Sequence, residues 1–324
     1  MTTNALFSIS SAEEFEALAL QVFKYQSKHV PIYKNFCEHL NCTTETVLKL
    51  EDIPFLPISF FKTHTVLSEK KESTYLFTSS GTTGSITSKH HVAELSVYKK
   101  SFSKGFAHFY GAVSEYTILA LLPSYLEREG SSLVYMVNSL LSDSNSEHSG
   151  FYLHDLEALI EKLQWLENQR KKTILIGVSY ALLDLIEKQN FQLKHTIVME
   201  TGGMKGRRKE MIKEELHAVL KNGFGVSQIH SEYGMTELLS QAYAKKNGDF
   251  YCPPWMKILT RDPEDALTLV EGKTGGINVI DLANYYSCSF IATQDLGKLN
   301  PEGSFKILGR FDESDIRGCN LMVL

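Results

Sequence analysis

The sequence of 324 residues predicts an α/β fold, with two layered α/β subdomains and a small β-rich, barrel-like subdomain. Three patterns support this prediction. Helical spacing dominates the first part of the chain, strand-like and helix-like segments alternate through the middle, and short strands separated by Gly, Pro and Asp turns occupy the last part. The 43% of apolar and 22% of charged residues are typical of a globular protein that folds along its whole length.

The N-terminal segment, residues 1–74, is predicted to be helical. Ser11 and Glu14 have the spacing of a capping box, and apolar side chains follow at helical intervals. Prolines then interrupt short apolar runs, which predicts short helices and irregular packing up to about Val66. These prolines are Pro31, Pro54 and Pro57.

The middle segment, residues 75–240, is predicted to form the α/β layers. Amphipathic runs of helical length, such as AELSVYKKSFSKGFAHF and HDLEALIEKLQWLENQ, separate short strand-like runs. Strands that alternate with helices of this length form βαβ units, and ligands of such sheets bind at the carboxyl ends of the strands. The strand-like runs are TYLFT, YTILALL, TILIGV, TIVMET and VSQIH.

The last part of the chain changes character. Residues 241–309 contain short strands such as INVIDL, FIATQDL and SFKIL, separated by turn residues, which predicts the β-rich subdomain. Residues 310–324 remain as a C-terminal tail.

Charge and cysteine content narrow the function classes. The formal net charge is -5, so no broad basic field favours nucleic acid as a partner. The five cysteines are odd in number and show neither CxxC nor zinc-ligand spacing, so we expect reduced thiols. The first ten residues lack the pattern of a signal peptide, and no apolar stretch is long enough to span a bilayer. We therefore expect a cytoplasmic protein that is not embedded in a membrane.

A hydroxyl-rich loop follows the strand-like run YLF. Its two glycines permit backbone conformations closed to other residues, and its hydroxyls and N–H groups can converge on an anion, which predicts phosphate binding. No Gly-Lys-Ser/Thr follows at the spacing of a Walker A loop. The alternative is a solvated turn. The loop comprises Thr78, Ser79, Ser80, Gly81, Thr82, Thr83 and Gly84.

A second segment, Tyr233-Gly234-Met235-Thr236-Glu237, ends the α/β region. An aromatic face can stack on a base, the Thr236 hydroxyl can reach a phosphate, and the Glu237 carboxylate can hold a Mg²⁺ ion carried by a nucleotide. The alternatives are a core aromatic at Tyr233 and a charge at a helix N-terminus at Glu237.

Two further sites are less specific. Asp295, in ATQDLG, is expected at the end of a strand, where it can accept both hydroxyls of a ribose; alternatively it forms a turn before Gly297. The pair His90-His91 is expected on a strand, where neighbouring side chains point to opposite faces. That arrangement allows one polar ring near the active site and excludes a metal pair.

These pieces, in this order, resemble the acyl-adenylate-forming superfamily, which includes acyl-CoA synthetases, phenylacetate-CoA ligases, firefly luciferase and nonribosomal adenylation domains. TSSGTTG matches the phosphate loop, YGMTE the nucleotide and magnesium motif, and TQDLG the ribose-binding segment. The residues Gly309-Arg310-Phe311-Asp312 match the hinge signature. The resemblance implies an adenylation core over residues 1–309 that uses ATP and Mg²⁺. It also implies that Gly202-Gly203-Met204 lines the adenine pocket and that Arg310 contacts ribose or phosphate.

The C-terminal segment resembles one branch of this superfamily more than the others. Typical members continue after the hinge into a lid domain with a catalytic lysine, whereas this sequence stops at Leu324, so we expect no lid domain. The segments LLPSYLEREGSSLVYM and SDIRGCNLMVL look like the LuxE-type acyl-protein synthetases of the bioluminescence fatty-acid reductase system. In those enzymes a cysteine close to the C-terminus takes the acyl group as a thioester, and the matching position is Cys319.

The resemblance implies ATP-dependent activation of a carboxylic acid, expected to be a fatty acid, as acyl-AMP. The acyl group would then pass to Cys319 and on to a protein such as an acyl reductase or an acyl carrier protein. Two alternatives stay open: a stand-alone ligase that loads coenzyme A or an acyl carrier protein directly, and a non-catalytic nucleotide-binding scaffold. The sequence identifies neither the acid nor the group that replaces the lid lysine, for which Lys89 and Lys205 are candidates.

Overall fold

The computed structural model describes residues 3–80, 86–123, 128–202, 208 and 211–311. Within them the α/β class is confirmed, and strands and helices alternate from residue 75 to residue 233. The helices are α1 (Thr3–Leu6), α2 (Ala12–His29), α3 (Pro31–His39), α4 (Phe60–Thr63), α5 (Leu95–Tyr110), α6 (Ser132–Asp143), α7 (Leu156–Asn168), α8 (Ser179–Lys188) and α9 (Lys213–Phe224). Short 3₁₀ helices are η1 (Leu50–Asp52), η2 (Val113–Glu115) and η3 (Leu282–Asn284).

The strands of the described residues form one large sheet and one hairpin. The strands are β1 (Leu56–Pro57), β2 (Tyr75–Thr78), β3 (Lys89–Val92), β4 (Thr117–Leu121), β5 (Gly150–Phe151), β6 (Thr173–Val178), β7 (Thr196–Thr201), β8 (His230–Tyr233), β9 (Ala242–Ala244), β10 (Phe250–Tyr251), β11 (Met256–Arg261), β12 (Thr274–Asp281), β13 (Phe290–Leu299) and β14 (Phe305–Arg310). The large sheet runs β11-β12-β13-β14-β10-β9-β8-β7-β6-β4-β5, with β1 beside β13, while β2 and β3 pair only with each other.

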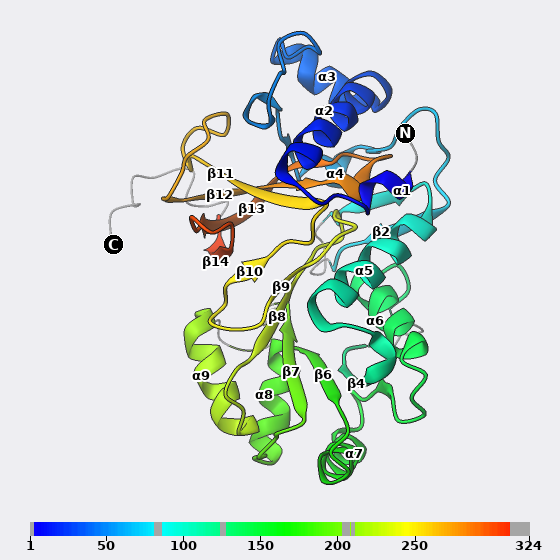
Figure 1. Ribbon diagram of the computed structural model, residues 1–324, viewed down its shortest axis with the longest axis vertical. Helices are drawn as coiled ribbons and strands as arrows, with labels where there is room; N and C mark the ends of the chain where they lie inside the picture. The colour runs from blue at the N-terminus through cyan, green and yellow to red at the C-terminus, as the bar shows by residue number, and fades with distance from the viewer. Residues whose placement is uncertain (1–2, 81–85, 124–127, 203–207, 209–210, 312–324) are drawn as a thin grey trace.

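The sheet changes from parallel to antiparallel at β8. Strands β4 to β8 pair in parallel, as the βαβ pattern requires, and every residue of β4 and β6 is buried. From β9 onward the pairs along the sheet are antiparallel, so the β-rich region after residue 241 continues the same sheet (Figure 1). The division of the chain into subdomains at residues 74, 240 and 309 stays a prediction.

Helices cover the parallel part on both faces. Met199 of β7 lines a small apolar cavity with side chains of α5 and α6, whereas its neighbour Glu200 contacts Lys213 and His217 of α9. Because successive strand residues point to opposite faces, α5 and α6 lie on one face and α9 on the other. The loops that follow β4, β6, β7 and β8 leave from the carboxyl ends of these strands, the edge at which such sheets bind ligands.

The N-terminal helices pack on the C-terminal strands, as Figure 1 shows for α2, α3 and β11 to β13. The predicted N-cap at Ser11 is confirmed, since its hydroxyl accepts a hydrogen bond from the Glu14 N–H at 3.2 Å. The reciprocal half of the capping box is replaced, because the Glu14 carboxylate accepts from the Ser10 N–H at 2.8 Å instead of the Ser11 N–H. The buried face of α2 then meets β13, where Phe23 lies edge-on to Phe290. Elements far apart in the sequence therefore share one core.

Two sequence expectations were wrong in position. The strand expected at VSQIH is β8, which begins only at His230, because pairing with β7 starts where Met199 lies opposite His230. Asp295 does not end a strand or form a turn but lies inside β13. The register between β13 and β14 shifts at Leu296 and Gly297, and a side chain at Gly297 would meet the Lys306 carbonyl at 2.3 Å, so glycine permits the bulge.

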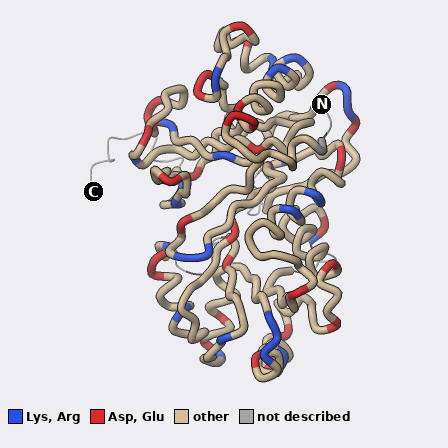
Figure 2. The backbone as a smooth tube through the Cα atoms, viewed as in Figure 1, with Lys and Arg blue, Asp and Glu red and all other residues tan. Residues whose placement is uncertain are grey.

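Charged residues are mixed over the fold, with Lys and Arg interspersed among Asp and Glu in both halves of the molecule (Figure 2). Among the described residues, no helix combines the length and the apolar character needed to cross a membrane.

Candidate active site

The predicted phosphate segment begins on the β2-β3 hairpin. Thr78 ends β2 opposite Lys89, and its N–H donates to the Gly130 carbonyl at 2.8 Å. The two sides of the loop are held together beyond the strands, because the Ser79 N–H donates to the Ser88 carbonyl and the Ser88 N–H donates to the Ser79 hydroxyl. Ser80 is exposed. The remaining predicted loop residues, Gly81, Thr82, Thr83 and Gly84, lie outside the described residues.

Three predicted nucleotide-binding residues come together where β8, β13 and β14 end or bend. The Tyr233 hydroxyl donates to Asp295 Oδ2 at 2.7 Å, and Arg310 Nε donates to Asp295 Oδ1 at 2.9 Å. Asp295 and Arg310 are direct partners in the β13-β14 register, which explains the ion pair. The Asp295 side chain is only 8% exposed, whereas that of Arg310 is 74% exposed and available to a ligand.

Glu237 is a buried carboxyl close to this group. Burial raises its pKa, against a hydrogen bond from the Ser88 hydroxyl and the positive charge of Arg310. The backbone of the segment is held by two side chains: His90 Nδ1 lies 2.9 Å from the Thr236 carbonyl oxygen, and Asn284 Nδ2 donates to the Glu237 carbonyl at 2.7 Å. The β2-β3 hairpin, the Tyr233–Glu237 segment and η3 therefore meet at one place.

Ser88 and Asn284 are contacts that the sequence did not identify. Ser88 follows the phosphate loop without belonging to its pattern, and Asn284 lies 47 residues after Glu237. Polar residues of these types are common in turns, so neither carries a signal of its own. One of the two histidines, His90 or His91, was expected near the site. His90 is fully buried and faces the site, while His91 is half-buried on the other face of the strand.

Gly202 follows β7 at the predicted adenine segment. Its φ of 68° lies in the left-handed region that favours glycine, and its carbonyl accepts a hydrogen bond from the Ser179 hydroxyl at 2.6 Å. Gly203 and Met204 lie outside the described residues. Glycine is required at position 234 for a steric reason, because a side chain there would lie 2.5 Å from the Glu232 carboxyl.

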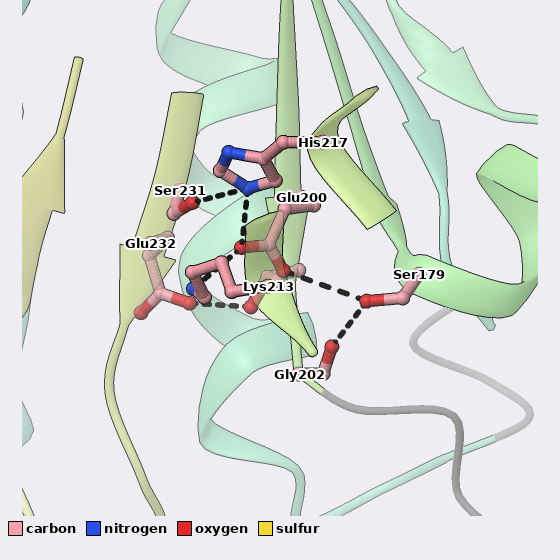
Figure 3. Close-up of polar contacts among 8 residues, drawn as sticks. Ser179, Glu200, Gly202, Lys213, His217, Ser231 and Glu232 are labelled. Carbon is pink, nitrogen blue, oxygen red and sulfur yellow. Dashed lines mark hydrogen bonds and ion pairs between the residues drawn. The ribbon is translucent and has the colours of Figure 1, made fainter. Parts of the chain in front are cut away.

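A buried polar cluster lies behind these segments, on β7, β8 and α9 (Figure 3). Lys213 Nζ donates to Glu200 at 2.7 Å, and His217 Nε2 lies 3.5 Å from the same carboxyl. Burial opposes ionisation of Glu200, but the Lys213 charge and the hydrogen bonds from His217 and Lys213 outweigh it and lower its pKa to about 2. Glu232 accepts a hydrogen bond from the Thr201 hydroxyl, and burial raises its pKa to about 7. No motif in the sequence pointed to this cluster.

The donor set at Glu237 fits a Mg²⁺ ion that arrives with a nucleotide. Magnesium is usually bound through one or two carboxylates together with substrate phosphates and water, rather than by an all-protein cage. Glu237 offers one such carboxylate, and Thr236 precedes it in the chain. Within the described part of the chain, no three His, Cys, Asp or Glu side chains gather in a way that could hold a metal ion.

The fold matches solved structures of ligases. An open form of 2-hydroxyisobutyryl-CoA ligase, in complex with 2-HIB-AMP and CoA, superposes with a TM-score of 0.67 at 14% identity over 93% of this chain and 75% of that chain. ATP-bound MatB from Rhodopseudomonas palustris gives a TM-score of 0.54 at 19% identity over 72% of this chain and 47% of that chain. These likenesses show that the architecture is shared.

Sequence comparison identifies the family. A long-chain-fatty-acid–luciferin-component ligase of Vibrio harveyi is 25% identical over 324 aligned residues, covering 92% of this chain and 84% of the relative. A protein of the same name from Photorhabdus luminescens is 35% identical over 68 residues, covering 21% of this chain and 58% of the relative. The family model described as acyl-protein synthetase, LuxE, matches residues 7–324. The chain belongs to this LuxE family of acyl-protein synthetases and is an AMP-forming ligase.

Proposed function

We propose that this protein uses ATP and Mg²⁺ to convert a fatty acid to its acyl-adenylate, transfers the acyl group to Cys319 and passes it to a protein partner in the cytoplasm. The observation that carries the proposal is the meeting of the β2-β3 hairpin, the Tyr233–Glu237 segment and the Asp295–Arg310 pair. These segments are spread over more than 200 residues of the sequence, and their side chains suit the parts of one nucleotide.

The proposed nucleotide position follows from the chemistry of each group. The Asp295 carboxylate accepts the ribose hydroxyls, and Arg310 donates to ribose or phosphate oxygens. We assign the adenine to the segment Gly202-Gly203-Met204 on the family resemblance. We assign the phosphates to the hydroxyls and N–H groups of residues 78–84 and to the Thr236 hydroxyl. When bound to Glu237, Mg²⁺ would neutralise phosphate charge.

In the first step a carboxylate oxygen of the acid attacks the α-phosphorus of ATP, forming a new O–P bond while the bond to pyrophosphate breaks. The attacking and leaving oxygens must be in line, so the residues act mainly by positioning the phosphates and stabilising their charge. The products are acyl-AMP and pyrophosphate.

A fatty acid as the substrate is supported by the Vibrio harveyi relative, which is a long-chain-fatty-acid ligase by name. The apolar cavity beside Met199 on the α5-α6 face of the sheet has a volume of only about 10 Å³. It is therefore a void in the packed core and too small for an acyl chain.

The choice of Cys319 as acyl acceptor is supported by the other four cysteines. Burial raises the pKa of Cys37 to about 12 and raises those of Cys42, Cys252 and Cys288, so none of them is a ready thiolate. Cys319 lies outside the described residues and within the region that the family model matches. Its thiolate would attack the carbonyl carbon of the mixed anhydride, so that a thioester forms and AMP leaves.

The test uses labelled fatty acid, ATP and magnesium with the parent, Cys319→Ser and the control Cys42→Ser. We expect a hydroxylamine-sensitive label on the parent and on Cys42→Ser, no label on Cys319→Ser, and acid-dependent ATP–pyrophosphate exchange in all three. Equal labelling of Cys319→Ser would contradict the acceptor role. Free acylation of coenzyme A without any labelled protein would favour the stand-alone ligase, and absence of exchange with every acid would favour a scaffold.

A further inference from the structure

His90 lies between the two segments that the proposed function assigns to phosphates and magnesium. On β3 it pairs with Phe77 of β2, so it belongs to the hairpin whose ends, Thr78 and Lys89, open into the phosphate loop. Its side chain is completely buried. The ring meets Phe61 edge-on, with centroids 5.4 Å apart, which restricts its orientation.

The hydrogen bonds of His90 define one tautomer. Nδ1 lies 2.9 Å from the Thr236 carbonyl oxygen, which can only accept, so Nδ1 carries the proton. Nε2 lies 2.9 Å from the Ser287 hydroxyl and accepts its hydrogen. Burial lowers the pKa of His90 to about 4, so the ring is neutral near neutral pH.

Ser287 also lies close to Asn284, the second side chain that holds the backbone of the Tyr233–Glu237 segment. The Ser287 hydroxyl also lies 3.3 Å from the Asn284 carbonyl, and the Asn284 side chain donates to the Glu237 carbonyl at 2.7 Å. Two side-chain donors thus hold successive carbonyls, those of Thr236 and Glu237. Ser287 lies close to both donors and gives its one proton to His90 Nε2. An apolar side chain could fill the space of the His90 ring equally well. The Nδ1–H donor to the Thr236 carbonyl is therefore what distinguishes histidine at this position.

Resting on the proposed function, we propose that His90 is a positioning residue for adenylation: its Nδ1–H holds the Thr236 carbonyl and thereby sets Thr236 and Glu237 against the open end of the β2-β3 hairpin, where Ser88 bonds to Glu237. His90 itself touches neither nucleotide nor acid. It affects catalysis through the positions of the Thr236 hydroxyl and the Glu237 carboxylate, which must act on the same phosphates. Misplacement of such groups by about 1 Å can lower the rate about a hundredfold.

The test is a matched pair of amide substitutions. The amide nitrogen of Asn can replace Nδ1 as the donor to Thr236, whereas the longer Gln can reach Ser287 but not that carbonyl. We expect His90→Gln to raise the KM for ATP·Mg and to lower kcat of the acid-dependent pyrophosphate exchange, each by about tenfold, as for one lost hydrogen bond. We expect His90→Asn to stay within about threefold of the parent in both, at a similar melting temperature.

The control for lost stability alone is Tyr33→Phe, which removes a buried hydrogen bond from Tyr33 to the Pro54 carbonyl, away from the site. A smaller folded fraction lowers the apparent kcat but leaves KM unchanged, so Tyr33→Phe should keep the KM of the parent. If both His90 variants fail to fold, Ser287→Ala tests the positioning role instead, because it removes a single oxygen atom. We then expect the KM for ATP·Mg to rise about threefold, as for one weakened hydrogen bond.

Equal KM and kcat in His90→Asn and His90→Gln, or an unchanged KM in Ser287→Ala where only that variant folds, would overturn the positioning role. Failure of the proposed function is a separate outcome, because then the parent shows no exchange with any acid. In that case calorimetric binding of ATP·Mg still decides: weaker binding to His90→Gln than to His90→Asn supports the role, and equal binding contradicts it.

Discussion

Glu237 combines a buried carboxyl with a proposed charged function. Burial raises its pKa, so a cation close to the carboxylate would stabilise the ionised form. Arg310 and the Ser88 hydroxyl partly offset this effect. At the scale of a single residue, the site is therefore prepared to gain from a divalent ion that arrives with the nucleotide.

Glu237→Gln should fold normally and lose most of its pyrophosphate exchange, because the substitution preserves shape and removes only the charge offered to Mg²⁺. The expected cost is about 2 to 4 kcal/mol in transition-state stabilisation, by analogy with loss of a preorganised electrostatic group. Exchange rates at saturating ATP and magnesium measure it. The control is Glu264→Gln, which makes the same change at an exposed residue. Unchanged exchange in Glu237→Gln would rule out the metal role.

Tyr233→Phe addresses the ribose contact. It removes the 2.7 Å hydrogen bond to Asp295 while keeping the aromatic ring against Phe250 and Phe305. We expect ATP affinity to fall by about fivefold to tenfold, the size of one ordinary hydrogen bond, because Tyr233 acts on the ribose only through Asp295. Calorimetric titration with ATP measures the change. The result would count against the assigned ribose site if the affinity equalled that of the parent.

At the scale of elements, β7, β8 and α9 are joined by buried charges. Glu200 on β7 is ionised beside Lys213 at the start of α9, while Glu232 on β8 favours its neutral form because it is buried and near the Glu200 carboxylate. The two carboxyls point to opposite faces of the sheet, since Glu232 pairs in register with Thr201 rather than with Glu200. Stability should therefore depend on pH through Glu232.

The raised pKa of Glu232 determines whether stability rises or falls with pH. Between the ordinary value of 4.5 and about 7, the unfolded chain releases the Glu232 proton while the folded protein keeps it, so rising pH costs stability. Glu232→Gln cannot titrate and still accepts a hydrogen bond from Thr201. Relative to the parent, we expect it to gain about 3 kcal/mol of unfolding free energy between pH 4.5 and pH 8.

Urea unfolding of the parent and Glu232→Gln at both pH values measures this difference. Glu215→Gln on the exposed side of α9 serves as the control and should show the same pH dependence as the parent. A constant difference between parent and Glu232→Gln at pH 4.5 and pH 8 would mean that Glu232 does not titrate in this window.

At the scale of the whole molecule, one glutamine joins the first helix group to the last strands. Gln26 of α2 is completely buried, and its amide nitrogen lies within 3.1 Å of the Asn284 carbonyl, the Tyr285 carbonyl and the Ser289 hydroxyl. Its side-chain oxygen accepts from the Ser289 N–H at 2.9 Å. Because Asn284 also holds Glu237, this contact connects the N-terminal helices to the candidate site.

Gln26→Ala should reduce the free energy of unfolding by about 3 kcal/mol, since it leaves several buried polar groups without partners. Gln21→Ala changes the same residue type on the exposed side of the same helix and should stay within about 0.5 kcal/mol of the parent. Urea unfolding at constant pH compares the two. Equal stability of both variants would show that the contact between the two ends of the chain is weak.

The elements that could be predicted from the sequence are those that depend on local patterns. Helical and strand periodicity placed α2, α5, α7, β4, β6 and β7, because these patterns depend on neighbours a few residues apart. Residue chemistry likewise identified Tyr233 and Asp295 as nucleotide-binding candidates, and the family resemblance added Arg310. The family match supports the reading of the whole chain as an acyl-protein synthetase.

The tertiary structure decided what depends on distant pairs. His90 and Thr236 are separated by 146 residues, and Gln26 and Ser289 by 263, so no periodic signal relates them. The charge state of Glu232 depends on burial and on Glu200, which only the folded sheet brings near. The sequence by itself determined the fold class, the family and the types of residue at the candidate site. Only the packed structure determined their partners and protonation, because burial and long-range hydrogen bonding are properties of the folded chain.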